Sequence, residues 1–301
     1  EGELWTDEFE RKVGASQLME RAAKETYKRG VPPREVLCLV AGIDTQDDRL
    51  SMSIWGAGAP IESVNYDRPE QLYLIDRIVL YGNIGRQDVW NQLDDVLTTP
   101  YKNEDGVELK IQAAAIDSGG HYTEEVYRWA KDRVAMGVMP IKGVDRLKGD
   151  IMLGKPNKVE YGSKGKVLKN SVKLFSIGVN KVKSYLYRRL RDAEPGDGYL
   201  HFYPTISEEY FEELTAEKEV RKYKRGRIYE RVWQLKSGAR NEAWDELIYA
   251  YSCVLRLYQT HNRRSMWDKF AKKLLNPTNS SGKNKLNLRN SATPTKGYVN
   301  Q

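Results

Sequence analysis

Residues 36–43 read VLCLVAGI, an apolar run without any charged side chain that leads directly into Asp44. A strand with one wet face alternates apolar and polar residues, whereas a continuous apolar run is typical of a strand covered on both faces. Sheets covered on both faces usually carry helices above and below. The run therefore predicts an α/β fold with residues 36–43 in an inner strand.

Further segments have the apolar spacing of strands, and helical patterns separate the later ones. Strands are expected at residues 50–56, 72–80, 111–116 and 138–141, and helices near residues 90–97 and 123–134. The turn after the first strand is short, so the first two strands are expected to be antiparallel. Three neighbouring strands followed by two strand–helix alternations predict a mixed sheet with helices on both faces.

The chain, at 301 residues, is long enough for more than one domain. Residues 1–35 are charged and helix-prone up to a Pro-Pro pair, which predicts a linker or the end of a preceding domain. Residues 36–262 are expected to form the main domain. Residues 263–301 are expected to be a mostly disordered tail, because large apolar residues are scarce toward the C-terminus.

Three segments of the main domain depart from the strand–helix alternation. Residues 154–173 are rich in Lys, Gly and Asn with short β-like runs, which predicts a protruding basic hairpin or flap. Residues 180–191 have the pattern of a basic amphipathic helix, and residues 240–258 that of a long helix with one apolar stripe.

The net charge is +7, and the positive excess is concentrated between residues 142 and 191. That segment has fourteen Lys or Arg against three Asp or Glu, a net charge of +11. Such a segment suits a polyanion, because Lys and Arg contacts to phosphates release condensed counterions. A solvated basic face is the alternative, but tyrosines lie among the charges and favour nucleic acid. The candidate DNA contacts are Lys142, Lys155, Lys158, Lys164, Lys166, Lys169 and Lys183.

Three aspartates occupy positions where a catalytic site could form. Asp44 ends the first buried strand, Asp117 ends the fourth, and Asp245 lies beside the apolar stripe of the long C-terminal helix. If the first and fourth strands are parallel neighbours, Asp44 and Asp117 meet at their carboxyl ends, where open α/β sheets bind ligands. The helix could bring Asp245 to the same place.

Three carboxylates in one place repel one another unless a cation lies between them. Hard divalent ions with oxygen ligands, Mg²⁺ or Mn²⁺, answer that need, and two such ions form the clamp used in phosphodiester hydrolysis. Glu242 is a further candidate ligand or the partner of Arg240, and His121 either touches water or phosphate or is an ordinary surface residue. Asp44 or Asp117 taken singly could be only a turn or cap residue, as an Asp after a strand often is.

Other chemistries have little support in the sequence. The three histidines are too few for a histidine metal cluster. The two cysteines, Cys38 and Cys253, are too few and too far apart in the sequence for a cysteine zinc cluster. No GxxxxGK[ST] loop is present, so ATP hydrolysis is not expected within this chain. No apolar run reaches the roughly 18 residues of a membrane helix, so no membrane partner is expected.

The segments AGIDTQDDRL, AAIDSGGHYTEEVY, PIKG and RNEAWDELIYAY, in that order, resemble the large terminase subunit of tailed phages, of the GpA type found in phage lambda. The resemblance runs over residues 37–258 and implies an RNase H-like nuclease domain that cuts concatemeric viral DNA when packaging starts and ends. It also implies that Asp44, Asp117 and Asp245 are the acidic metal-binding residues, and that residues 1–35 are the tail of the ATPase domain.

The partners that the resemblance implies are double-stranded DNA, the ATPase domain of the same subunit, the small terminase subunit and the portal protein of the procapsid, in the cytoplasm of the host cell. Two alternatives remain open at this point. One is another RNase H-like nucleotidyl transferase, such as a transposase or resolvase. The other is a non-catalytic DNA- or portal-docking module whose acids are structural.

Overall fold

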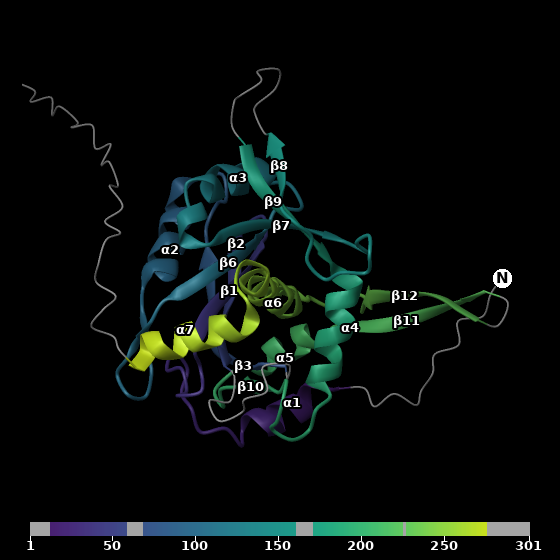
Figure 1. The fold of residues 1–301 in the computed structure, drawn as a ribbon. Helices are drawn as coiled ribbons and strands as arrows, with labels where there is room; N and C mark the ends of the chain where they lie inside the picture. The colour runs from purple at the N-terminus through teal and green to yellow at the C-terminus, as the bar shows by residue number, and fades with distance from the viewer. Residues whose placement is uncertain (1–12, 59–68, 161–170, 225–226, 276–301) are drawn as a thin grey trace, which may run out of the picture.

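The computed structural model describes residues 13–58, 69–160, 171–224 and 227–275 (Figure 1). Its central element is an eight-stranded sheet in the order β10-β3-β2-β1-β6-β7-β9-β8. The strands are β1 (Cys38–Thr45), β2 (Arg49–Gly58), β3 (Gln71–Tyr81), β6 (Ile111–Asp117), β7 (Val138–Val144), β8 (Asn157–Glu160), β9 (Ser171–Gly178) and β10 (Leu200–Phe202). The inner strand predicted from the apolar run is β1, which is buried from Cys38 to Asp44.

The sheet is mixed, as the sequence pattern predicts. β1, β2 and β3 are antiparallel, whereas β6 and β7 continue the sheet parallel to β1. β9 is parallel to β7, and β8 pairs antiparallel with β9. Part of the predicted flap therefore extends the main sheet, because β8 and the first residues of β9 fall within residues 154–173 and pair with each other.

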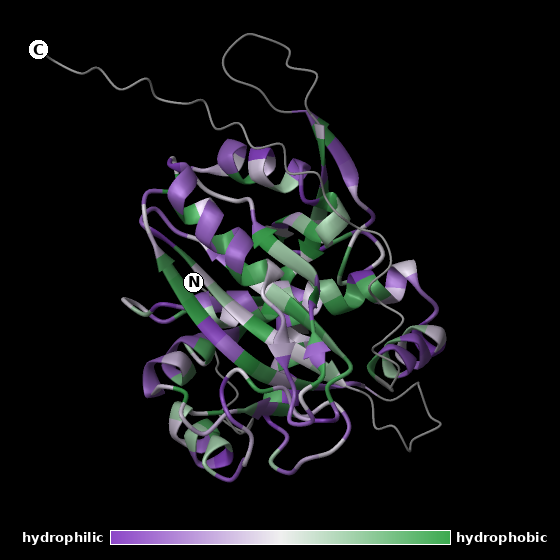
Figure 2. Ribbon diagram, turned by 90° about the vertical axis from the view of Figure 1, so that its left-hand side faces the viewer, coloured by the Kyte–Doolittle hydropathy of each residue, from purple (hydrophilic) through white to green (hydrophobic). Residues whose placement is uncertain are grey.

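Helices cover both faces of the sheet (Figure 1). The long helix α6 (Glu242–Thr260) packs on β1, β2 and β6. The helices α2 (Gln87–Thr98) and α3 (Thr123–Lys131) pack on the other side, and a 3₁₀ turn at Val134–Met136 follows α3. The inner strands are mostly hydrophobic, while the outer helices carry mixed surfaces (Figure 2).

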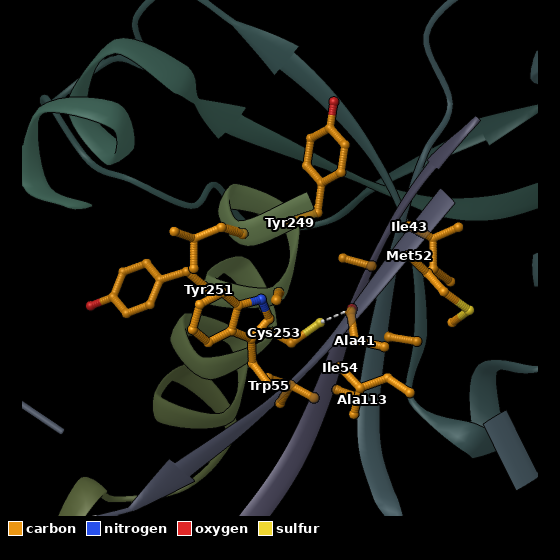
Figure 3. Close-up of a cluster of buried hydrophobic side chains, with 14 of the residues drawn as sticks. Ala41, Ile43, Met52, Ile54, Trp55, Ala113, Tyr249, Tyr251 and Cys253 are labelled. Carbon is orange, nitrogen blue, oxygen red and sulfur yellow. Dashed lines mark hydrogen bonds between the residues drawn. The ribbon is translucent and has the colours of Figure 1, made fainter. Parts of the chain in front are cut away.

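Gly42 on β1 allows α6 to lie directly on the strand. A Cβ atom at Gly42 would lie 1.9 Å from the Glu246 carbonyl oxygen and 2.5 Å from the Ala250 nitrogen, so no other residue fits this contact. The Cys253 thiol donates to the Ala41 carbonyl oxygen at 3.5 Å (Figure 3). The core side chains beside this contact include Ile43, Met52, Ile54 and Ala113.

The remaining elements surround this core. α1 (Ala15–Ala22) buries Leu18 and packs against α5 (Glu208–Leu214), and α7 (Arg263–Leu275) buries Trp267. α4 (Val179–Leu190) corresponds to the predicted basic helix, and β4 (Tyr101–Lys102) and β5 (Glu108–Leu109) form a small hairpin. A second hairpin, β11 (Glu217–Lys224) with β12 (Arg227–Leu235), projects from the body and was not predicted (Figure 1).

Residues 276–301 of the predicted tail and residues 161–170 at the centre of the predicted flap lie outside the described residues, whereas residues 263–275 of the predicted tail form α7. The division into residues 1–35, 36–262 and 263–301 stays a prediction. Within the described ranges, no helix is both long and apolar enough to cross a membrane.

Candidate active site

Asp44 and Asp117 lie next to each other at the carboxyl ends of β1 and β6. The two strands are parallel and pair Ile43 with Ile116, the residues just before the aspartates. The Thr45 hydroxyl donates to the Asp117 carbonyl oxygen at 3.2 Å and ties the two strand ends together. The predicted parallel pairing of these strands is confirmed.

Asp245 reaches the same end of the sheet from the first turn of α6. The next residue, Glu246, stands over Gly42, two positions before Asp44. Glu246 is fully buried and accepts hydrogen bonds from the hydroxyls of Ser51 and Ser53 on β2. Ser51 and Ser53 of β2 are buried under α6, and their hydroxyls connect that strand to the helix.

The three aspartates influence one another electrostatically. Burial raises the pKa of Asp44 well above its usual range, and the charges of Asp245 and Asp117 raise it further, against a hydrogen bond from the Gln46 amide. Burial also raises the pKa of Asp117, against the hydrogen bonds of the Gly119 and Ser118 N–H groups and the charge of Lys142. The charge of Asp117 thus acts on Asp44 and also on Asp245, which places the three carboxylates near one another.

Asp245 also has a raised pKa. Burial raises its pKa to about 7, and the charges of Glu217 and Asp117 act in the same direction, while Lys183 lowers it. The Asn241 amide donates to Asp245 Oδ2 at 2.9 Å. At neutral pH this carboxyl is therefore poised between its two protonation states in the absence of a bound cation.

The donor set is suited to a hard divalent cation, although the side chains are not arranged around one. Carboxylate oxygens are the ligands that Mg²⁺ and Mn²⁺ prefer. Across the described part of the chain, no three His, Cys, Asp or Glu side chains are arranged so as to hold a metal ion. The aspartates instead accept hydrogen bonds from Gln46, Gly119 and Asn241, which leave further lone pairs on each carboxylate for an ion.

Glu217, which was not predicted, is a fourth acid at this site. It begins β11, is 8% exposed, and accepts from Lys183 Nζ at 2.6 and 2.7 Å and from Asn241 Nδ2 at 2.7 Å. Lys183 Nζ also lies 3.8 Å from Asp245 Oδ1. Glu217 has no motif around it in the sequence, so only the fold reveals its place.

Two of the candidate residues form ion pairs within the protein, and these pairs occupy the groups that were predicted to bind DNA or a metal ion. Lys183, a predicted DNA contact, has a side chain only 12% exposed and is paired with Glu217. Glu242 is bound by Arg49 Nη2 at 2.6 Å and Arg240 Nε at 3.0 Å. Burial acts to raise the pKa of Glu242, but the hydrogen bonds from the two guanidinium groups lower it overall.

The other predicted residues lie around the pocket or outside the described ranges. Lys142 is exposed on β7, and its charge acts on Asp117. His121 is exposed, with Nδ1 3.3 Å from Asp47 Oδ1. Lys155 and Lys158 are exposed near and on β8, whereas Lys164, Lys166 and Lys169 fall outside the described residues.

The sequence matches a family model described as "Terminase large subunit gpA, endonuclease domain" over residues 1–267. The chain belongs to this family. This confirms the resemblance drawn from the sequence segments. The range matched by the terminase family contains Asp44, Asp117, Asp245, Lys183 and Glu217.

Two curated relatives are large terminase subunits. The chain is 33% identical over 260 residues to that of Escherichia phage lambda and 30% identical over 261 residues to that of Enterobacteria phage P21. Each alignment covers 84% of this chain but only 37% of the relative, so the chain spans little more than a third of their length. No solved structure matched the chain.

Proposed function

We propose that this chain is a metal-dependent DNA endonuclease domain that cuts concatemeric viral DNA during genome packaging. One observation carries the proposal: carboxylates from β1, β6 and α6 gather at one end of the sheet, where the charges of Asp117 and Asp245 raise the pKa of Asp44 and the charge of Asp117 raises that of Asp245. The terminase family to which the chain belongs supports DNA as the substrate. The strand order β3-β2-β1-β6-β7, with β6 and β7 parallel to β1, is consistent with an RNase H-like fold.

Asp44, Asp117 and Asp245 would hold two divalent ions, Mg²⁺ or Mn²⁺. When bound, such ions supply an activated water and stabilise the leaving 3′ oxygen. Glu242 is left out of this ligand set, because two arginines occupy its carboxylate.

The chain's own residues orient the ligands and attract the substrate. Asn241 bridges Asp245 and Glu217 through its amide, and Lys183 neutralises Glu217, so Asp245 faces a reduced negative charge. Lys142 lies beside Asp117 as a cation for the DNA backbone, with Lys155 and Lys158 farther along the same basic segment. These lysines would bind phosphates without reading sequence.

The remaining proposals concern the whole subunit. The ATPase domain of the same subunit, the small terminase subunit and the portal protein of the procapsid are proposed partners, in the host cytoplasm. Because the chain lacks a GxxxxGK[ST] loop, we assign it cleavage and not ATP hydrolysis. Site choice on the DNA would then come from the partners.

The substitution Asp117→Asn tests the proposal. It removes one charge from the pocket, so nicking of supercoiled plasmid in Mn²⁺ or Mg²⁺ should fall at least about 100-fold, on the scale of losing an essential electrostatic group. Plasmid relaxation followed on agarose gels measures this, with circular dichroism to check that the variant is folded.

Asp47→Asn is the matched control, because Asp47 is an exposed acid close to the pocket with only His121 as a partner. It should cut like the wild type, and EDTA should stop both. Undiminished cleavage by folded Asp117→Asn would contradict the site. Strand joining in place of hydrolysis would indicate a transposase, and DNA binding without any cleavage would indicate a docking module.

A further inference from the structure

Tyr249 lies one helical turn after Asp245 on α6 and has no role in the site as described so far. Its side chain is nine-tenths buried, with the residue 8% exposed. Its hydroxyl makes no hydrogen bond to the described residues and is not among the enclosed polar atoms that lack a partner, so the hydroxyl end of the buried ring is accessible. A tyrosine with a buried ring and an accessible hydroxyl can present that hydroxyl to a bound group.

The direction of the side chain places its hydroxyl with the acidic residues. In Figure 3 the ring of Tyr249 points away from the apolar cluster, in the direction in which β1 runs from Ala41 to Ile43 and on to Asp44. Tyr251 on the same helix points elsewhere and stacks on Tyr185, with ring centroids 5.3 Å apart. Of these two tyrosines of α6, Tyr249 is the one turned toward the strand ends.

The electrostatics of Tyr249 agree with this placement. Burial raises its pKa well above the usual range, and four negative charges raise it further, those of Asp245, Asp117, Asp44 and Glu217. These are the four acids of the pocket. The phenol therefore stays protonated wherever the carboxylates are charged, which suits a hydrogen-bond donor and opposes a nucleophile.

The hydroxyl is thus a neutral donor, without an acceptor among the described residues, that points toward the carboxyl ends of the strands where the acids gather. Once cations balance the carboxylates, the group that brings new acceptor oxygens is the substrate phosphate. Its non-bridging oxygens gain charge during cleavage, so a fixed donor stabilises the transition state more than the ground state.

We propose that Tyr249 is a further catalytic residue, whose hydroxyl donates a hydrogen bond to a non-bridging oxygen of the scissile phosphate. The proposal rests on the proposed nuclease function. It requires no covalent step, because the proton stays on the phenol and the bond to phosphorus is made by water.

Tyr249→Phe tests the proposal, with Tyr251→Phe as the matched control on the same helix. Under single-turnover conditions at saturating Mn²⁺, Tyr249→Phe should nick plasmid about 10- to 100-fold more slowly, as for the loss of one transition-state donor. Its affinity for DNA, measured by fluorescence anisotropy in EDTA, should stay within two-fold of wild type. Tyr251→Phe should retain wild-type cutting.

Two further measurements separate a phosphate contact from a structural or metal effect. On DNA whose non-bridging oxygens are replaced by sulfur, a poor acceptor, the wild type should slow in one diastereomer and Tyr249→Phe should show little of that additional loss. A Mn²⁺ titration should leave the half-saturating concentration of Tyr249→Phe unchanged; recovery of its rate at high Mn²⁺ would overturn the phosphate contact.

A Tyr249→Phe variant that cuts at the wild-type rate would overturn this inference alone, since the wild type would still be a nuclease. If the folded wild type cuts in neither Mn²⁺ nor Mg²⁺, the proposed function fails and this inference fails with it. Thermal melts of both variants, expected to match the wild type closely, establish that rates are compared between folded proteins.

Discussion

At the scale of single residues, the pocket places acids where their charges are unfavourable. Asp44 and Asp245 both have raised pKa values with burial as the first cause, and Lys183 only partly offsets the effect at Asp245. A group with a raised pKa binds its proton more tightly in the folded state than in the unfolded state. The metal-free protein therefore carries an electrostatic cost near neutral pH.

This cost predicts how stability depends on pH. For Asp245 the folded pKa is about 7 against 3.8 for an ordinary Asp, so its stabilising contribution is complete below pH 3.8 and is lost as the pH rises to about 7. Thermal melts in EDTA should show the melting temperature of the wild type falling more steeply over that window than that of Asp245→Asn. Mn²⁺ should raise the wild-type melting temperature more at pH 8 than at pH 5. A flat difference between the two proteins across the window would contradict the burial of a charged Asp245.

At the scale of elements, the hairpin β11–β12 is connected to the helix that carries Asp245. Trp233 of β12 packs on Trp244, the residue before Asp245, with centroids 6.0 Å apart, and on Tyr187 of α4 at 5.3 Å. At the other strand, Glu217 is held by Lys183 of α4. The base of the hairpin thus joins α4 to the first turn of α6.

Lys183→Met tests this joint, with Lys181→Met on the same helix as its control. Lys183 is mostly buried against Glu217, so its loss should leave a buried carboxylate underpaired and destabilise the protein by about 1–3 kcal/mol. Lys181 pairs with Asp150 at an exposed site, where a change should stay within about 0.5 kcal/mol. Urea unfolding followed by tryptophan fluorescence compares the two. Equal, small effects would show that the Lys183 pair does not hold the joint.

At the scale of the whole molecule, an acidic pocket opens within a basic chain. The chain carries a net charge of +7. Its basic segment, residues 142–191, begins within β7, the neighbour of the strand that ends in Asp117. Positive charge around a pocket of carboxylates attracts DNA from a distance, while the pocket itself needs cations before a phosphate can enter. Binding and cutting should therefore respond differently to salt and to metal.

Removing the positive charges of the predicted flap tests whether the basic segment binds DNA. Replacing Lys164, Lys166 and Lys169 by Gln should weaken DNA binding equally for all sequences and reduce the slope of log affinity against log salt by about 1 per lysine that contacts a phosphate. Fluorescence anisotropy over a salt series measures the slope. Lys102→Gln with Lys110→Gln, exposed residues before the amino end of β6, should leave the slope unchanged. A triple variant with the wild-type slope would assign the flap lysines to ordinary solvated surface.

The sequence predicts those elements of the structure whose pattern lies within a short segment of the chain. β1 and β6 are clear because continuous apolar runs end in Asp44 and Asp117, and parallel pairing then brings those ends together. β10 has only three residues and β11 is mostly charged, so neither has a strand pattern. Glu217 and the partners of Glu242 depend on burial and on contacts between distant segments. Such contacts leave no trace in the order of residues along the chain.

The absence of a Cβ atom at Gly42 sets the distance between β1 and α6, and therefore the separation of the acids that they carry. Because α6 already contacts the backbone of β1, it cannot move closer to the strand, and moving it away to make room for larger acids would open the packed core between them. If an Asp were replaced by Glu to change the ion preference, the longer side chain would therefore need the loops near Asn241 and Gly119 to move. The contact between β1 and α6 is the rigid side of the site, and the turns are the side that can adjust.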